Sequence, residues 1–318
     1  MSTEMSWNSV STCDAQVNCP SLLLFNDPRY SSHNVKTGQK YQRFDAFSCG
    51  KWQGSLAGVR QGSVFTSGFS APFGGFDVEN SRATTAALQD LVDDLLEQVW
   101  ASGVYALRIR LRPCFYSENE QTLLFFLLNR GFEVEHAELN QHVCLQNIPG
   151  PDVYLAGLRP PARRAVRHGL ATSYAFVEAA TNEEWQAAYD LLAANRATKG
   201  RRLRFSFEYL RDMRDTFPRA IRMHVLSQHD RPVAAALVYR LLSCRDYVVA
   251  WGDALHDLKR SPMNLLAYHL IETALSQKIL SLDLGISSLE GIPDTGLCRF
   301  KRSLGARSTV RFNVFRSL

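Results

Sequence analysis

The sequence predicts an α/β (α+β) protein made of two tandem domains, each a mixed and mostly antiparallel sheet flanked by helices. Two observations support this prediction: an order of hairpin, helix, strand, helix and strand that occurs twice, and a similar spacing within each copy. From the strand end at Leu111 to Gly131 there are 20 residues, and from Leu284 to Gly305 there are 21. The length of 318 residues also suits two domains. We therefore expect three segments: a disordered N-terminal segment at 1–20, a first domain at 21–150, and a second domain at 151–318.

Each element of the first copy has its own local signal. Residues 54–68 read as a hairpin, and residues 82–101 read as a helix with one apolar stripe and an acidic opposite face. The stretch 104–111 alternates apolar and basic residues, which is typical of a strand. A second helix at 119–130 ends at Gly131, where a further strand begins.

The second copy repeats this order near the C-terminus. Ser261 as N-cap and Pro262 at the first helical position open its main helix. The remaining predicted elements are a hairpin at 220–242 with its turn at Gln228–Pro232, a strand at 246–252, a strand at 279–284, a short helix that ends at Gly305, and a last strand at 309–315.

The composition excludes several classes of protein. Hydrophobic residues make up 46% of the chain, which is enough for real cores, and the net charge of +5 is far below that of a dedicated nucleic-acid binder. The seven cysteines are scattered without a Cys-x-x-Cys pair and the eight histidines do not cluster, so we predict neither a disulfide framework nor a metal site. The start of the chain lacks a signal-peptide pattern and no apolar run is long enough to span a bilayer, so we expect a cytoplasmic protein.

Five short motifs point to a family. They are SAPFGGF (70–76), LRPPARRAVRHG (158–169), NRATKG (195–200), RPVAAALVY (231–239), and LDLG (282–285) followed by RFKRSLG (299–305). In this order, on a doubled pattern of elements, the chain resembles the tandem-GNAT acyltransferases of the Fem type, which build peptidoglycan cross-bridges, and the neighbouring BioF2-like group.

The resemblance implies a function and a set of donors. It implies transfer of an acyl or aminoacyl group from a thioester or ester donor to an amine acceptor, with acyl-CoA, an acyl-carrier protein or an aminoacyl-tRNA as the donor. The sequence departs from the usual GNAT pattern at one place, because HDLKRSPMN (256–264) stands where a pyrophosphate-binding loop is usual. The aromatic residues near 205–209 alternate as a strand or turn edge would, so the sequence itself gives little support for tRNA.

The resemblance also implies catalytic residues. Lys301 matches the lysine that stabilises the developing negative charge, and Phe300 is expected to pack inward and to fix the angle of its helix. Arg299 and Arg302 flank the lysine and either meet solvent or contact the phosphates of the donor. Asp283 ends the inner strand, where it could receive the proton of the amine or could simply cap the following loop.

Two further groups of cations are candidate phosphate contacts. Lys259, Arg260 and Ser261 precede the main helix, whose N-terminus suits a phosphate, although the two cations read equally well as a solvated loop. Arg163, Arg164 and Arg167 on a basic helix, with Lys199, are candidate contacts for the acceptor, although runs of charge are usually solvated faces.

Two functions from different classes therefore follow from the sequence. The first is an N-acyltransferase in which Lys301 stabilises the oxyanion. The second is a catalytically silent tandem-GNAT module that binds an acyl-carrier, nucleotide or protein partner. The departure at 256–264 motivates this alternative.

Overall fold

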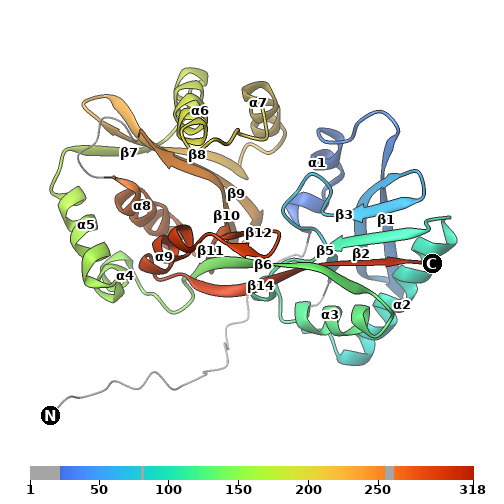
Figure 1. Cartoon of the computed structure of the whole chain (residues 1–318). Helices are drawn as coiled ribbons and strands as arrows, with labels where there is room; N and C mark the ends of the chain where they lie inside the picture. Colours follow the sequence, from blue (N-terminus) through green and yellow to red (C-terminus); the bar gives the residue numbers. More distant parts are fainter. Residues whose placement is uncertain (1–21, 80–81, 255–260) are drawn as a thin grey trace, which may run out of the picture.

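A computed structural model describes residues 22–79, 82–254 and 261–318 of the chain (Figure 1). The expected disordered segment at 1–20 and the candidate residues Lys259 and Arg260 lie outside these ranges. The elements of the first half (22–150) are η1 (Leu24–Asn26), α1 (Pro28–Ser32), β1 (Gln39–Ser48), β2 (Lys51–Gln61), β3 (Val64–Ser67), β4 (Phe76–Val78), α2 (Thr85–Ala101), β5 (Ala106–Arg110), η2 (Cys114–Tyr116), α3 (Glu120–Leu128) and β6 (Glu133–Cys144).

The second half (151–318) repeats the same kind of order. Its elements are α4 (Pro151–Gly157), α5 (Pro160–Leu170), β7 (Tyr174–Glu178), α6 (Asn182–Ala197), α7 (Phe207–Thr216), β8 (Ile221–Gln228), β9 (Arg231–Leu242), β10 (Arg245–Asp253), α8 (Met263–Ser276), β11 (Ser281–Ile286), β12 (Ser288–Leu289), β13 (Ile292–Pro293), α9 (Thr295–Ser303) and β14 (Arg307–Ser317). The predicted α/β class is confirmed, since helix, strand, helix and strand follow each other in both halves.

Local sequence signals account for most element boundaries. The hydroxyl of Thr84 caps α2 by accepting a hydrogen bond from the backbone N–H of Ala87 at 3.2 Å. The main helix of the second half begins at Met263, one residue later than predicted, with Pro262 as its N-cap. The hydroxyl of Ser261 still accepts a hydrogen bond from the N–H of Met263, at 3.3 Å. Ser261 therefore satisfies a free N–H of the first turn, although it precedes the N-cap residue.

The two halves share one sheet, which the sequence did not predict. The strands run in the order β1-β2-β3-β5-β14-β6-β11-β10-β9-β8-β7, with β4 attached to β2. The last strand, β14, therefore lies between β5 and β6 of the first half, and β6 in turn pairs with β11 of the second half (Figure 1). Both contacts are antiparallel, and together they join the halves through backbone hydrogen bonds rather than through side chains alone.

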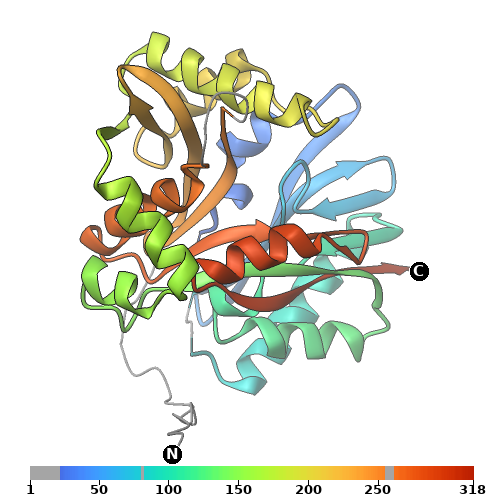
Figure 2. The ribbon, with the colours of Figure 1, turned by 60° about the vertical axis from the view of Figure 1, so that its left-hand side comes forward.

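Helices cover the sheet on both faces. In the second half α6 and α7 pack on one face of β8 and β9 through Trp185, Leu192 and Leu210, whereas α5 and α8 pack on the opposite face through Val166 and Leu266. In the first half α2 and α3 supply the apolar side chains that cover the sheet. Figure 2 shows α9 lying over the central strands β6 and β14, close to where the two halves meet.

Candidate active site

Two parallel strands part in the middle of the second half. β10 and β11 pair in parallel at only three positions, the last of which is Tyr247 with Asp283. Beyond this point β10 follows β9 through a register shift between Val248 and Ala250, and Gly285 turns β11 away with a φ of +74°. A positive φ favours glycine, so this residue type allows the strands to part here.

Lys301 lies at this point. Its side chain is 1% exposed, and its Nζ donates hydrogen bonds to the carbonyl oxygens of Gly285 and Ile286, both at 2.9 Å. Burial lowers the pKa of Lys301 to about 8, against the opposing influence of Asp283. An ammonium has three N–H donors, so the two bonds to β11 leave one for another group.

The helix that carries Lys301 is fixed at both ends. The carboxylate of Asp294 caps α9 by accepting a hydrogen bond from the N–H of Leu297 at 2.9 Å, and Gly305 follows its end with a φ of +78°. Phe300 is half-buried, and its ring centroid lies 5.6 Å from that of Trp251 on β10. Phe300 thus packs against the sheet. Its expected role in fixing the angle of α9 stays a prediction.

Asp283 is fully buried and accepts three hydrogen bonds. Its donors are the hydroxyl of Tyr116 at 2.9 Å, the amide of Asn140 at 2.8 Å and the backbone N–H of Gly285 at 2.8 Å. Burial raises the pKa of Asp283, although these hydrogen bonds and Lys301 act in the opposite direction. The bond to Gly285 is a local one, two residues further along the same strand β11. Tyr116 and Asn140 belong to the first half, so both halves build this site.

Arg299 and Arg302 are exposed on the outer face of α9. Together with Arg159, Thr295 and Cys298 they line an open hollow of about 380 Å³. Arg159 precedes α5 and adds a third guanidinium to the two predicted from the sequence. Arg299 and Arg302 are exposed, whereas Lys301 on the same helix is buried.

The other candidate phosphate contacts do not form one site. Arg163, Arg164 and Arg167 lie on α5, and Arg163 donates a hydrogen bond to the carbonyl oxygen of Ala156 at 2.9 Å. Lys199 follows α6, on the opposite face of β8 and β9, and its Nζ donates to Asn195 at 3.1 Å. The structure therefore does not bring Lys199 and the arginines of α5 together.

Ser261 also has a local partner. Its hydroxyl donates to the carboxylate of Asp253, at 2.5 Å, near the end of β10. This bond holds the start of α8 against the strand that leads to it.

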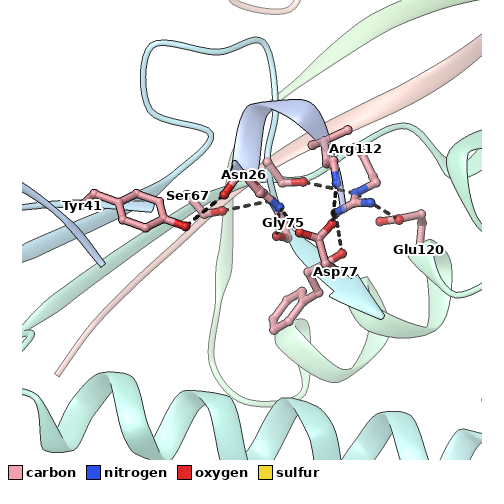
Figure 3. A network of polar contacts seen from close by, with 10 residues as sticks. Asn26, Tyr41, Ser67, Gly75, Asp77, Arg112 and Glu120 are labelled. Atoms are coloured by element: carbon pink, nitrogen blue, oxygen red, sulfur yellow. Dashed lines mark hydrogen bonds and ion pairs between the residues drawn. The ribbon is translucent and has the colours of Figure 1, made fainter. Parts of the chain in front are cut away.

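The corresponding place in the first half is filled by a buried ion-pair network (Figure 3). The guanidinium of Arg112, just beyond β5, lies 2.9 Å from Asp77 and 3.3 Å from Glu120, and it donates to the carbonyl oxygen of Phe76 at 2.5 Å. The amide of Asn26 donates to Asp77 at 3.0 Å. Burial raises the pKa of Glu120 to about 8, with Arg112 opposing it. Side chains of the protein itself thus close the gap between β4 and β5.

The glycines of SAPFGGF serve this same closed arrangement. A Cβ atom on Gly74 would lie 2.4 Å from the backbone nitrogen of Gly68, and the N–H of Gly74 donates to the carbonyl oxygen of Arg110 at 2.8 Å. Gly68 and Gly74 thus form a tight bend. This bend admits the backbone of the chain itself.

Sequence reasoning missed the residues that reach the site from far away in the chain. Tyr116 and Asn140 lie 167 and 143 residues from Asp283, and no local pattern marks them. Trp251 was read only as part of a strand. Among the residues that the structure describes, no three His, Cys, Asp or Glu side chains are grouped as a metal site would need, and no helix has the length and apolarity required to cross a membrane.

Comparisons with known proteins agree with this architecture. Residues 157–302 match the family model of the acetyltransferase (GNAT) domain. The crystal structure of FemX is similar over 94% of this chain and 93% of that chain, with a TM-score of 0.73 and 14% sequence identity. L-PGS from Bacillus licheniformis is similar over 86% of this chain and 84% of that chain, with a TM-score of 0.55 and 12% identity. No curated protein matches the chain by sequence.

The comparisons place the fold. The chain has a fold similar to that of FemX, and residues 157–302 in its second half match an acetyltransferase (GNAT) domain. The matched range contains both Asp283 and Lys301, whereas Tyr116 and Asn140, which donate hydrogen bonds to Asp283, lie outside it.

Proposed function

We propose that the chain is an N-acyltransferase that moves an acyl or aminoacyl group from a thioester or ester donor to an amine, with the ammonium of Lys301 stabilising the oxyanion. The observation that supports this is the buried position of Lys301, where β10 and β11 part, with one N–H left after its two bonds to Gly285 and Ile286. A fixed ammonium in a site with little water stabilises a developing negative charge more strongly than one in bulk water.

The proposed reaction proceeds through a tetrahedral intermediate. The amine nitrogen bonds to the carbonyl carbon of the donor, and the carbonyl oxygen takes up the negative charge beside Lys301. Collapse of the intermediate re-forms the C=O bond and breaks the C–S or C–O bond to the leaving group. The amine loses one proton and the departing sulfur or oxygen gains one. Asp283 is the carboxylate that receives the amine proton, and its raised pKa favours that role.

The hollow beside α9 is the proposed contact for the phosphates of the donor. Acyl-CoA, the phosphopantetheine arm of an acyl-carrier protein and aminoacyl-tRNA all carry phosphate groups. Arg159, Arg299 and Arg302 present three guanidinium groups around one hollow, and guanidinium pairs well with phosphate oxygens. This arrangement offers an anion site even though the usual pyrophosphate loop is missing from the sequence.

Turnover measurements on matched variants test the role of Lys301. The full-length chain is incubated with acetyl-CoA, a loaded acyl-carrier protein or an aminoacyl-tRNA, together with a set of amines, and products are identified by mass spectrometry. We expect Lys301→Met to lower kcat on the order of 10²–10³-fold, as loss of an oxyanion donor does. Lys51→Met changes an exposed lysine on β2 and is the control, for which we expect the rate of the wild type. Full turnover by Lys301→Met would remove this residue from the mechanism.

One observation favours the alternative of a silent binding module. Both hydrogen bonds of Lys301 go to carbonyl oxygens of the chain itself, so this lysine also has a structural role at the end of β11. A thermal-shift series with the same three donors separates the two functions. Stabilisation by a donor with no product from any amine would establish the binding module.

A further inference from the structure

Arg311 is a buried cation without a partner. It lies on β14, where the two halves of the sheet meet, and its side chain belongs to a residue that is only 6% exposed. Its Nε has no hydrogen-bond partner, and no ion pair joins its guanidinium to another described residue. A buried charge left unpaired is strongly unfavourable, so a guanidinium in this state indicates a place for an anion.

The carboxylates near Arg311 are already engaged. Glu138 lies directly opposite Arg311 on β6, but its two oxygens accept hydrogen bonds from the hydroxyl of Ser288 and from the N–H of Glu290. Asp283 accepts three hydrogen bonds from other groups. Neither carboxylate therefore neutralises Arg311 directly, although both are close enough to influence its pKa.

A second cation makes the local charge more positive. Arg110 lies on β5 opposite Asn313, two residues from Arg311 on the same face of the sheet. Its guanidinium donates to the carbonyl oxygens of Gly68 and Ala71, which carry no formal charge. Burial and Arg311 together lower the pKa of Arg110.

Near the unpaired guanidinium of Arg311 lies a side-chain oxygen that accepts no hydrogen bond from the described residues, the Oδ1 of Asn140. Asn140 is diagonal to Arg311 across the β6–β14 pair, since Asn140 faces Thr309 and Glu138 faces Arg311. The Nδ2 of Asn140 donates to Asp283, which fixes the orientation of the amide, and its Oδ1 is buried without a partner. Diagonal neighbours across a strand pair are within reach of one small ligand. Such a ligand would offer an anionic oxygen to Arg311 and an N–H to Asn140.

We propose that this face of β6 and β14 binds the acceptor, and that the acceptor is an amino-carboxylate, whose carboxylate pairs with Arg311 and whose amine donates to Oδ1 of Asn140. The amine then lies beside Asp283, to which Asn140 is hydrogen-bonded and which accepts the amine proton in the proposed reaction. The role of this ligand as an acceptor rests on the function proposed above, whereas its binding does not.

Binding measured without any donor tests the proposal. Racemic alanine is the probe, and three compounds are compared with it. Alaninamide lacks the carboxylate, propionate lacks the amine, and inorganic phosphate is an oxyanion that has neither group. Saturation-transfer NMR and thermal shift report binding to the full-length chain. We expect alanine to bind at least ~10-fold more tightly than alaninamide or propionate, because a charge-assisted hydrogen bond contributes on the order of 10-fold or more.

Matched variants on the same strand locate the site. Arg311→Gln should weaken alanine binding ~10-fold or more, whereas Arg316→Gln, further along β14 and over the ring of Trp100, should leave it unchanged. Because Arg311 lacks a partner, we expect Arg311→Gln to keep or raise the melting temperature in the absence of ligand. A large fall in that temperature would mean that Arg311 has a structural partner, and the proposal would be wrong.

The remaining outcomes are also decisive. Equal binding of alanine and alaninamide, alanine binding that survives Arg311→Gln, or a response to phosphate alone would each overturn the amino-carboxylate assignment. Arg311-dependent alanine binding in a chain that forms no product with any donor would support the site and refute the acyltransferase. Product formation by a chain whose alanine binding is unaffected by Arg311→Gln would support the acyltransferase and refute the site at Arg311.

Discussion

The burial of Lys301 in the proposed active site carries an energetic penalty. Burial lowers its pKa to about 8, below the ordinary value of 10.5, so the unfolded chain binds more protons than the folded one between these two values. The ammonium therefore opposes folding by about 3 kcal/mol at neutral pH, and this penalty is relieved as the pH rises from 8 towards 10.5. Residues that destabilise a fold are found mostly at functional sites. The energetic cost of burying Lys301 therefore agrees with its proposed role in the reaction.

The same pKa predicts how the rate depends on pH. The proposed mechanism needs the charged form of Lys301, so kcat should fall as the pH rises through about 8. A profile between pH 6.5 and 9.5 with a saturating donor checks this. Lys301→Arg is the control, because a guanidinium keeps its charge over this range and its residual activity should show no such fall. A wild-type rate that is flat across pH 8 would contradict the role.

Tyr116 is one of two residues of the first half that donate a hydrogen bond to Asp283. Tyr116→Phe removes one hydrogen bond from a fully buried carboxylate, so we expect the free energy of unfolding to drop by about 1–2 kcal/mol and the pKa of Asp283 to rise further. Urea unfolding at pH 7 measures the first effect. Tyr105→Phe, which changes an exposed tyrosine, is the control and should unfold like the wild type.

At the scale of elements, the two halves use the same strand arrangement in opposite ways. In the second half β10 and β11 part, and the side chain of Lys301 reaches from α9 to the backbone of β11 there. In the first half the parallel pairing of β3 with β5 also stops, after Ser67 and Ile109, but Arg112 then bridges to β4. We infer that the first half is a scaffold, since its own ion pairs occupy the gap in which the second half holds its catalytic candidate.

This interpretation predicts a large structural cost for the loss of Arg112. Arg112→Met leaves the carboxylate of Asp77 buried without its cation, so we expect destabilisation of about 3–5 kcal/mol. Denaturant unfolding measures the effect, and Arg82→Met, which changes a cation 3.9 Å from the exposed Glu118, is the matched control with an effect below about 1 kcal/mol. Equal stability of the two variants would show that the network in Figure 3 is not a structural bridge.

At the scale of the whole molecule, β14 makes the halves inseparable. It pairs with β5 and β6 of the first half at the same time, and β6 pairs with β11 of the second half. We expect a chain cut after Gly305 to lose the cooperative unfolding transition of both halves, because it leaves β5 and β6 without their shared neighbour. Circular dichroism follows the whole chain, and variants that keep only Trp100 or only Trp251 report by fluorescence on the two halves separately. A transition preserved in either half would show that this half folds without β14.

The sequence predicted the local features of the fold and missed its long-range ones. The stripe on 82–101, the capping near Ser261 and the glycines after α3 and α9 are all set by residues within a few positions, and each of these helices is present in the structure. The exchange of β14 into the first half has no local signal, because any strand that alternates apolar and polar residues satisfies the same pattern in either sheet.

The same distinction applies to the site. Lys301 and Phe300 were found through a short motif, and the structure places both at the point where the strands part. Arg311 was read only as one position of a final strand, since nothing in its neighbourhood shows that it is buried or that Glu138 is engaged elsewhere. The separation of Lys199 from α5 likewise depends on which face of the sheet each helix covers, and the sequence alone does not give that.

The central position of β14 affects the folding of the nascent chain during translation. The facing edges of β5 and β6 are complete once residue 144 has been made, but the strand that fills the space between them is the last of the described strands to be synthesised. Until then these edges present free backbone N–H and C=O groups, which can pair with another molecule of the same kind. Rapid translation at high concentration should therefore favour aggregation of unfinished chains, and a holding chaperone should improve the yield more than it would for two domains that close independently.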